Sequence, residues 1–475
     1  MNPASSSSRG ILLAHSYYLR YDDKQTHKMK PYPPLATMVV AAVLRERGYS
    51  VQLFDAMLSP GTDQFASALQ VGRPWVVGLI EDNFNFLTKM CTLRMREAAL
   101  EMVRLARAAG AKVVVNGSDA SDHPELFLAS GADAIITGDP EPAMVELLEL
   151  WSGSGQVPLE LVPGLVLAAN GNGGVHRTVH RQSLTDLDAL PLPAWDLVDP
   201  ELYRRAWVAA HGRLSWNVVT SRGCPYRCNW CAKPLFGTRY AQRSPANVAA
   251  ELRELKDRVG PDHVWFADDI FGLTPGWIES FAREVKARGA RLPFSMQSRV
   301  NLMTPRVVDA LAEAGAEEVW LGVESGSQRI LDAMDKGTTV AQVRAATRQL
   351  RARGIRTGWF VQLGYRGEQW SDIVQTRDLV TDEWPDEVGV SVAYPLPGTK
   401  FFDQVRGELG PKANWEDSDD LDMMFHGTYL TSFYKRVRDV IHAEVRSRQR
   451  CDPEWQELAS REATSRTVAP AFGSP

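Results

Sequence analysis

Short apolar runs alternate with longer amphipathic segments along most of this 475-residue chain. Between residues 10 and about 151, five runs have the composition of buried strands: GILLAHS, VQLFDA, WVVGLI, KVVVNG and AIITG. Helical stretches fall between them, most clearly from Leu87 to Ala109. Near-continuous apolar strands that alternate with helices are typical of a parallel sheet covered on both faces. We therefore predict an α/β domain with a doubly wound parallel sheet over residues 10–151.

A second alternation begins near Ser215. Its strand candidates are SWNVVTS, HVWFAD, PFSMQS, EVWLGVES, TGWFVQLG and GVSVAY, and its helices include residues 245–258, 275–288 and 339–353. Six strand–helix units predict a partial (β/α)6 barrel of the TIM type over residues 201–400. In such barrels the functional residues lie at the carboxyl ends of the strands.

The remaining segments are less regular. Residues 1–9 predict a disordered leader, and residues 152–200, rich in Gly, Pro and Asp, predict a linker with one small hairpin in PGLVLAANGNGGVHR. Residues 401–475 predict a small helical segment, centred on about 428–449, that ends in a disordered tail, RTVAPAFGSP.

Composition narrows the function classes. Hydrophobic residues make up 44% and charged residues 23% of the chain, as in ordinary globular proteins. A net charge of -5 without a basic stripe argues against a nucleic-acid partner. No apolar run has the length of a membrane span, and the first residues lack a signal-peptide core. We therefore expect a cytoplasmic protein.

Three cysteines, Cys224, Cys228 and Cys231, fall in the run TSRGCPYRCNWCAKPLFG directly after a strand candidate. Thiolates at this spacing on one loop can all bind a single soft metal centre. A cubane cluster has four irons, so three ligands leave one iron open for another molecule. A structural zinc site would need a fourth Cys or His nearby. Cys91 and Cys451 are distant, and five scattered cysteines form no disulfide framework.

The spacing C-x3-C-x2-C, with the aromatic Trp230 before the last cysteine, resembles the signature of the radical S-adenosylmethionine (SAM) superfamily. The resemblance implies a 4Fe–4S cluster whose open iron is chelated by the amino and carboxylate groups of SAM. An electron from the reduced cluster would cleave the sulfonium and release a 5'-deoxyadenosyl radical. It also implies an external one-electron donor of the flavodoxin or ferredoxin type, while the protein supplies orientation and shielding.

The same resemblance places Trp230 in the cofactor site, and it assigns polar residues at the ends of later barrel strands to SAM. Glu324, Ser325 and Gly326, in LGVESGS, would contact its ribose or methionine moiety, and Arg299 could meet its carboxylate. Gly364, in VQLGYRGE, would let the backbone approach the adenine because it has no Cβ. The alternatives are an ion pair between Glu324 and Arg299 at the barrel rim and a plain turn at Gly364.

Three further residues lie at strand ends. Asp268 and Asp269, in WFADDIFG, are paired carboxylates that could bind substrate or act as acid and base. Alternatively, Asp269 caps a turn. Tyr394, in YPLPGT, would line the adenine pocket by resemblance, or belong to the core.

A doubly wound domain before such a barrel resembles the cobalamin-binding-domain class of the superfamily, and the resemblance covers roughly residues 10–400. PYPPLATMVVAAVLRERGYSVQLFDA and VNGSDASDHPELFLASGADAIITGDPEPAMVELL carry it. The D-x-H-x-x-G motif that supplies an axial histidine is absent: His27 lacks the flanking residues, and His123 more simply starts a helix. Many radical members of the class hold cobalamin without that histidine. Gly117 and Gly138 would line a nucleotide-tail groove, or form plain strand-end turns.

The reaction implied is hydrogen abstraction from a carbon of a small, polar, natural-product-like substrate. With cobalamin bound, C-methylation follows. Without it, the radical could lose water, as in the similar radical dehydratases that deoxygenate sugars in aminoglycoside antibiotic biosynthesis. We favour methylation because that class is more populous. A non-catalytic cobalamin or iron–sulfur sensor would need an output module, and no DNA-binding helix pair follows the barrel.

Overall fold

The computed structural model of the protein describes residues 10–84, 92–169, 174–231, 239–412 and 414–467. The chain divides into two compact units. The first comprises residues 1–225, 233–269 and 416–419, and the second comprises residues 226–232, 270–415 and 420–475. The predicted leader (1–9) and most of the predicted tail (468–475) lie outside the described residues.

The first unit contains a sheet with the strand order β2-β1-β3-β4-β5-β6-β7. The first five strands are parallel, and each corresponds to one of the five predicted runs. The doubly wound sheet is therefore confirmed. Its elements are β1 (Ile11–Ala14), α1 (Asp23–Lys28), α2 (Leu35–Glu46), β2 (Val51–Phe54), α3 (Thr62–Gly72), β3 (Val76–Ile80), α5 (Leu93–Ala108), β4 (Lys112–Asn116), α6 (Ser118–Asp122), α7 (Pro124–Ala129), β5 (Ala134–Ile136), α8 (Pro140–Ser152), β6 (Leu165–Ala168) and β7 (Val175–Arg177).

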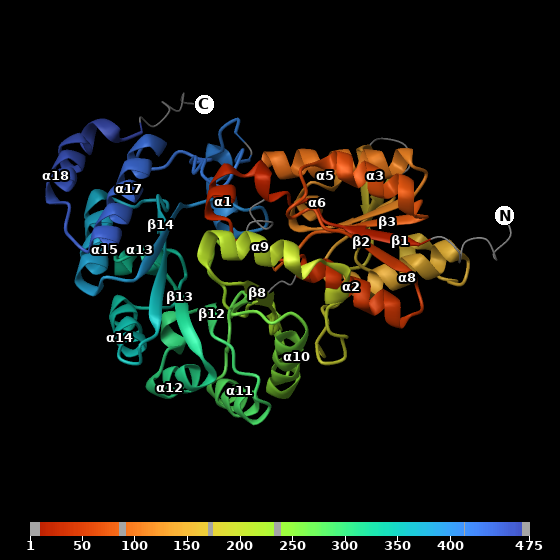
Figure 1. Ribbon diagram of the computed structural model, residues 1–475. Coiled ribbons are helices and arrows are strands. Elements are labelled where there is room, and N and C mark those ends of the chain that lie inside the picture. Colours follow the sequence, from red (N-terminus) through yellow and green to blue (C-terminus); the bar gives the residue numbers. More distant parts are fainter. Residues whose placement is uncertain (1–9, 85–91, 170–173, 232–238, 413, 468–475) are drawn as a thin grey trace, which may run out of the picture. The chain divides into compact units, whose positions relative to one another are not determined.

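Helices cover both faces of this sheet. Figure 1 shows α3 and α5 along one face and α2 and α8 along the other. All residues of β1 and β3 are buried, so both alternating sets of side chains meet a helical layer. On one face, Leu12, Val77 and Val113 pack with Met102 and Val103 of α5 in the same hydrophobic core.

The predicted hairpin forms, but it belongs to the sheet. β6 pairs antiparallel with β7 and also with β5, through Ile135 opposite Val166. β5 has only three residues, and without this neighbour one of its edges would present unpaired backbone groups. The hairpin thus closes that edge.

The remaining elements of the first unit lie before and after the cysteine loop in sequence. β8 pairs in parallel with β11, with Ser215 opposite His263 and Val218 opposite Phe266. β9 and β10 form a short antiparallel ribbon directly before and after the loop. The elements are α9 (Pro200–His211), β8 (Ser215–Val218), β9 (Ser221–Arg222), β10 (Ala241–Gln242), α10 (Pro245–Arg258) and β11 (His263–Phe266).

The second unit contains four parallel strands that pair in chain order, from β12 to β15. Together with β8 and β11 they account for all six predicted barrel strands. The elements are α11 (Pro275–Ala287), β12 (Phe294–Ser298), α12 (Pro305–Ala314), β13 (Ala316–Glu324), α13 (Gln328–Ala333), α14 (Val340–Arg351), β14 (Arg356–Leu363), α15 (Trp370–Glu383), β15 (Glu387–Val392), α16 (Lys400–Val405), α17 (Thr431–Ser447) and α18 (Asp452–Arg461).

In its described residues, the segment 401–475 holds α17 and α18 as well as most of α16, where the sequence predicted one helical region. α17 corresponds to that region, and α18 follows it after a short turn. α18 was missed, although Pro453 near its start is a common signal for a first helical turn. Across the described ranges, no helix combines the length and apolar character needed to cross a membrane.

Candidate functional site

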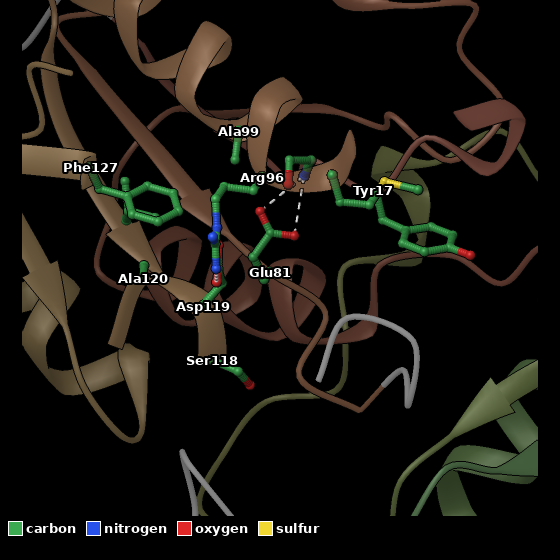
Figure 2. Close-up of a pocket in the computed structure, with 11 residues that line it drawn as sticks. Tyr17, Glu81, Arg96, Ala99, Ser118, Asp119, Ala120 and Phe127 are labelled. Atoms are coloured by element: carbon green, nitrogen blue, oxygen red, sulfur yellow. Dashed lines mark hydrogen bonds and ion pairs between the residues drawn. The ribbon is translucent and has the colours of Figure 1, made fainter. Parts of the chain in front are cut away.

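The carboxyl edge of the N-terminal sheet carries a pocket where the strand order reverses. β1 lies between β2 and β3, so the connections that leave β1 and β3 diverge at this edge. Ser16 and Tyr17 line the pocket after β1, Glu81 after β3, and Ser118 and Asp119 after β4 (Figure 2). Open α/β sheets bind their ligands at such a switch point.

Apolar side chains supply most of the pocket surface, and some of its polar groups lack hydrogen-bond partners among the described residues. Glu81 accepts the Ser16 N–H at 3.1 and 3.3 Å, and burial raises the pKa of its carboxyl group. Arg96 of α5 donates its Nε–H to Asp119 at 2.8 Å. The hydroxyl groups of Tyr17 and Ser118 are buried, and they have no hydrogen-bond partner among the described residues. Since buried hydroxyls without partners are costly, the pocket offers them to a ligand.

The two glycines predicted for this edge differ in their surroundings. A Cβ on Gly117 would lie 2.8 Å from Cγ of Glu81, so the residue lets the end of β4 pass close to that side chain. Gly138 has φ +80°, and its carbonyl accepts from Asn116 Nδ2 at 3.2 Å. Both features suit strand-end turns, and a role in a nucleotide-tail groove stays a prediction.

The two histidines that were considered as axial ligands in the sequence, His27 and His123, do not line the pocket. His27 is exposed on α1, and His123 stands at the start of α7, as expected. His15 was overlooked: it is buried after β1, where Nε2 accepts the Ala56 N–H at 3.0 Å and lies 3.0 Å from Asp55 Oδ1. Nδ1 of His15 is buried without a hydrogen-bond partner among the described residues, so only Nε2 is engaged within the protein.

The cysteine loop follows β9. Cys224, Cys228 and Cys231 are half-buried, and none of them is in a disulfide. In the described part of the chain, which includes the three cysteines, no three His, Cys, Asp or Glu side chains are grouped so that they could hold a metal ion. The residues directly after Cys231 (232–238) lie outside that part. The three thiols remain a candidate set through the chemistry of their sulfur donors.

Asn229, between Cys228 and Trp230, is bonded to other residues of the second unit. Its N–H donates to the Met334 carbonyl at 3.0 Å, its carbonyl accepts the Phe401 N–H at 3.0 Å, and Nδ2 donates to the Ala333 carbonyl at 2.7 Å. The residue is buried. Asn229 was not predicted, because its partners lie far away in sequence.

Trp230 was predicted to line a cofactor site, and the structure places it against apolar residues of the second unit. It packs on a core cluster that includes Met334, Tyr365 and Phe401. Lys336 Nζ lies 5.9 Å from the centre of its ring. The packing shows how Trp230 can fix the loop, and cofactor contact stays a prediction.

The rim ion pair proposed between Glu324 and Arg299 does not form. Glu324 accepts a hydrogen bond from Lys336 Nζ at 2.6 Å, and both side chains are buried. Glu324 has φ +64°, a left-handed conformation that costs a non-glycine residue about 1–3 kcal/mol. Arg299 instead donates Nη1–H to Cys228 Sγ at 3.4 Å. The alternative ion pair was wrong because it gave no weight to Lys336, and contact of Glu324 and Arg299 with SAM stays a prediction.

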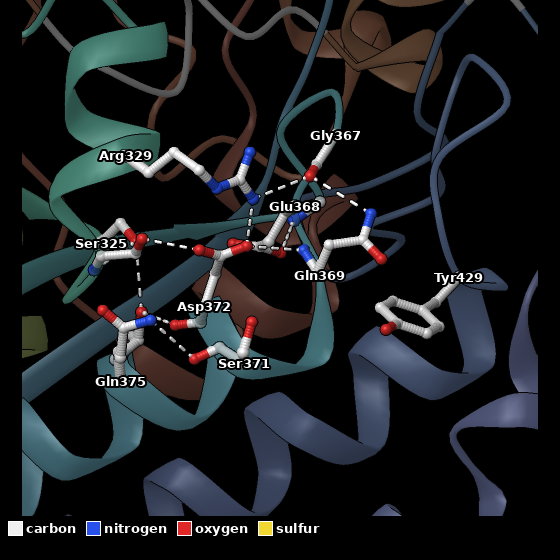
Figure 3. A network of polar contacts seen from close by, with 12 residues as sticks. Ser325, Arg329, Gly367, Glu368, Gln369, Ser371, Asp372, Gln375 and Tyr429 are labelled. Carbon is white, nitrogen blue, oxygen red and sulfur yellow. Dashed lines mark hydrogen bonds and ion pairs between the residues drawn. The ribbon is translucent and has the colours of Figure 1, made fainter.

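Ser325 belongs to a network of polar contacts (Figure 3), and the backbone of Gly326 joins it through Thr376. The N–H of Gly326 donates to Thr376 Oγ1 at 2.9 Å, and the Ser325 hydroxyl lies 3.3 Å from the same oxygen. Ser327 donates to Asp372, which also pairs with Arg329. These contacts hold the turn after β13 against α15, and contact with SAM stays a prediction.

Asp268 and Asp269 differ sharply in burial. Asp268 is completely buried, and it accepts hydrogen bonds from Thr220 N–H at 3.0 Å, from Thr220 Oγ1 at 2.9 Å and from Ser221 Oγ. Burial raises the pKa of Asp268 to about 7, although these hydrogen bonds oppose the shift. It thus holds the backbone that leads into the cysteine loop. Asp269 is half-buried and remains the better candidate for substrate contact.

Gly364 and Tyr394 follow β14 and β15. Gly364 has φ +75°, and its N–H donates to Glu368 Oε2 at 2.7 Å. A Cβ there would lie 3.0 Å from Met423 Sδ, so the turn also makes room for the C-terminal segment. Tyr394 packs on Trp415, with ring centres 4.4 Å apart. For both residues the structural alternative has direct support, and adenine contact stays a prediction.

Arg222, two residues before Cys224, forms a buried ion triad that the sequence did not reveal. Its guanidinium donates to Asp139 at 2.7 Å and to both oxygens of Glu141, at 2.6 and 3.1 Å. Asp139 and Glu141 begin α8, after the fifth strand of the N-terminal sheet. The three side chains are at most 6% exposed, so the cysteine loop is anchored to that domain.

Comparison with known families agrees with these two sites. Residues 218–380 match the radical SAM superfamily, and residues 30–148 match the B12 binding domain. This chain is a radical SAM enzyme with a B12-binding domain. The first match includes the cysteine loop, and the second includes most of the pocket residues.

Individual relatives cover most of the enzyme. An uncharacterized methyltransferase of Pyrococcus horikoshii is 27% identical over 406 residues, which are 84% of this chain and 84% of that protein. The anaerobic magnesium-protoporphyrin IX monomethyl ester cyclase of Rubrivivax gelatinosus is 25% identical over 392 residues, 80% of this chain and 67% of that one. A solved structure of the radical SAM methyltransferase TsrM from Kitasatospora setae, with cobalamin and a 4Fe–4S cluster bound, aligns with TM-score 0.68 at 21% identity. It covers 84% of this chain and 77% of TsrM, and it confirms the predicted fold class.

The radical SAM family implies a 4Fe–4S cluster and SAM, and the second domain implies cobalamin. The residues present fit these groups. Three cysteine thiols outside disulfides are the donor set of a cluster with one open iron, and the Arg299 N–H is directed at one sulfur, as in many iron–sulfur sites. The unpartnered hydroxyls of Tyr17 and Ser118 suit a polar ligand such as cobalamin in the switch-point pocket.

Proposed function

We propose that this radical SAM enzyme methylates a carbon of a small, polar, natural-product-like molecule, using SAM as the methyl source and cobalamin as the carrier. The observation that carries this proposal is the Arg222 triad, since it ties the residues next to Cys224 to the first turn of α8. The cluster loop and the cobalamin-binding domain are thereby coupled by buried charges. Such coupling is expected of two cofactors that serve one reaction.

When bound, the three cofactors would supply sulfonium cleavage, hydrogen abstraction and methyl delivery. The chain's own residues position them. Cys224, Cys228 and Cys231 would ligate the cluster, and Asn229 holds their loop. Tyr17 and Ser118 would donate to cobalamin. Glu324 and Lys336 would form the polar wall of the SAM site, because their ion pair fixes the end of β13.

Among the two carboxylates first considered as acid and base, Asp269 is proposed to contact substrate. Asp268 has no exposed surface, and its carboxylate accepts hydrogen bonds from Thr220 and Ser221 instead. These bonds hold the segment that leads into the cysteine loop. Hydrogen abstraction needs no protein base, so a binding role for Asp269 suffices. An external one-electron donor of the flavodoxin or ferredoxin class would reduce the cluster.

Two alternatives remain distinguishable. Cobalamin-independent dehydration of a sugar diol would leave the unpartnered hydroxyls in the switch-point pocket unused, whereas cobalamin binding uses them. A sensor would leave SAM intact. The relative named as a cyclase indicates that methyl transfer is not the sole outcome to measure.

The test uses protein purified from cobalamin-supplemented cells and reconstituted with iron and sulfide under anaerobic conditions. With dithionite, SAM carrying a deuterated methyl group and a small-molecule extract of the source cells, we expect 5'-deoxyadenosine, S-adenosylhomocysteine and one extract component with a deuterated methyl. Cys228→Ala should abolish all three. Release of 5'-deoxyadenosine alone, by protein without a corrin absorption band, would favour dehydration. Intact SAM beside an assembled cluster would favour the sensor.

A further inference from the structure

Arg299 is a buried cation that lies beside Cys228. It follows β12, and it is 6% exposed. Within the described ranges, no carboxylate pairs with it, since Glu324 is occupied by Lys336. A buried charge without a counter-charge is strongly unfavourable. The counter-charge must therefore come from a group that binds there, and Cys228 supplies one when its sulfur is a thiolate ligand.

The guanidinium is held in a fixed orientation. Its plane lies against the ring of Tyr226, with Cζ 3.8 Å from the ring centre. Nε–H donates to Asn301 Oδ1 at 3.2 Å, and Nη2–H donates to the carbonyl of Lys336. Nη1–H is thereby directed at Cys228 Sγ, 3.4 Å away. An arginine restrained on three sides loses little further freedom when it donates to a sulfur.

We propose that Arg299 is a positioning residue that raises the reduction potential of the cluster through its hydrogen bond to the Cys228 sulfur. Reduction adds one electron, and with it one negative charge, to the cluster. A nearby cation and an N–H donor stabilise the reduced form more than the oxidised form. The inference rests on the cluster assignment of the proposed function. It differs from the expectation that Arg299 anchors the SAM carboxylate, because its effect does not require SAM.

The test is an anaerobic redox titration of the reconstituted protein without SAM, followed by the electron paramagnetic resonance signal of the reduced cluster. Arg299→Gln should shift the reduction equilibrium at least tenfold toward the oxidised form, which lowers the midpoint potential by about 59 mV for one electron. Arg306→Gln is the matched control, since Arg306 is 72% exposed on α12. Its potential should equal that of the wild type. An unchanged potential in Arg299→Gln overturns the inference, and weaker SAM binding with that unchanged potential supports the carboxylate anchor instead.

Two further variants cover the case in which Arg299→Gln fails to hold a cluster. Arg299→Lys keeps the charge but cannot make the three directed hydrogen bonds, and Tyr226→Leu removes the ring that orients the guanidinium. Both should lower the potential, by less than the loss expected for Arg299→Gln. Unchanged potentials in both variants overturn the inference. The iron and sulfide contents of the wild type distinguish failure of this inference from failure of the proposed function. A wild type without a cluster refutes the proposed function itself.

Discussion

The phenol oxygen of Tyr365 lies 2.9 Å from Oδ1 of Asn229 and donates its hydrogen bond across 136 residues of sequence. With this contact, all four polar groups of Asn229 have hydrogen-bond partners, because its N–H, its carbonyl and its side-chain amide nitrogen are also bonded. The residue between Cys228 and Trp230 is therefore fixed by protein contacts alone. Contacts of this kind hold Asn229 in place, which is how a preorganised site is built.

Tyr365→Phe should loosen this loop. The change leaves Asn229 Oδ1 buried without a donor, which costs about 1–3 kcal/mol. Urea unfolding of the cluster-free protein should show that loss, and a chelator should remove iron from the reconstituted variant faster than from the wild type. Tyr429→Phe is a suitable control, because its hydroxyl bonds to Glu462 near the C-terminus. Equal rates of iron loss in Tyr365→Phe and the wild type would contradict the role of Asn229.

Glu368 gives the protein a pH-dependent stability. It is completely buried beside Gly364, Oε1 has no partner among the described residues, and burial raises its pKa to about 8 (Figure 3). The folded protein therefore keeps a proton that the unfolded chain loses near pH 4.5. This contribution to stability is complete below that pH, and it is lost as the pH rises through about 8, with a slope of up to ~1.4 kcal/mol per pH unit.

Glu368→Gln should flatten that dependence. Glutamine has the shape of the protonated acid and can still accept the Gly364 N–H. At pH 8.5 the variant should be more stable than the wild type, while at pH 5 the two should be similar. Urea unfolding at several pH values measures both. Glu313→Gln, at a half-exposed site on α12, should leave the wild-type slope unchanged. A Glu368→Gln slope equal to that of the wild type would show that Glu368 is ionised when folded.

The strands could be predicted because each one is a run of consecutive apolar residues that can be recognised without knowledge of its partners. β1, β3 and β4 are buried along nearly their whole length, so the composition of each run reports its environment directly. The cysteine spacing is equally local. The pairing of β5 with β6 was not predicted, because nothing within the hairpin sequence indicates which edge it joins.

The contacts of the site were predicted less well, because they join residues that are distant in sequence. Asn229 meets Ala333 across 104 residues, and Arg222 meets Glu141 across 81. Lys336 lies only 12 residues from Glu324, but it follows α13 and not a strand. A search restricted to the ends of strands therefore missed it. An arginine next to an apolar strand, as in NVVTSRGC, was the available signal for a buried ion pair.

Arg222→Met should be severely destabilising. It leaves Asp139 and Glu141 buried as two like charges without their cation, and breaking a buried ion group costs about 3–5 kcal/mol. Burial already raises the pKa of Asp139, so at pH 5 proton uptake should recover part of the loss. Urea unfolding at pH 5 and pH 8 compares the two conditions. Arg253→Met removes an exposed pair on α10 and should change stability by less than about 0.5 kcal/mol. A loss for Arg222→Met no larger than this control would refute the anchoring role of the triad.

Gly326→Ala should displace the turn after β13. An added Cβ would lie 2.4 Å from the Gln375 carbonyl oxygen and 2.5 Å from Thr376 Cα, and these are backbone atoms of α15 that cannot rotate away. Such overpacking costs about 1–3 kcal/mol. Because Glu324 and Ser325 belong to the same turn, SAM affinity should fall together with stability. Gly276→Ala is the matched control, since nothing lies within 4 Å of its added Cβ and it sits in the first turn of α11. Calorimetric unfolding and SAM titration measure both effects. Unchanged SAM binding in a destabilised Gly326→Ala protein would remove this turn from the SAM site and leave it a purely structural junction between β13 and α15.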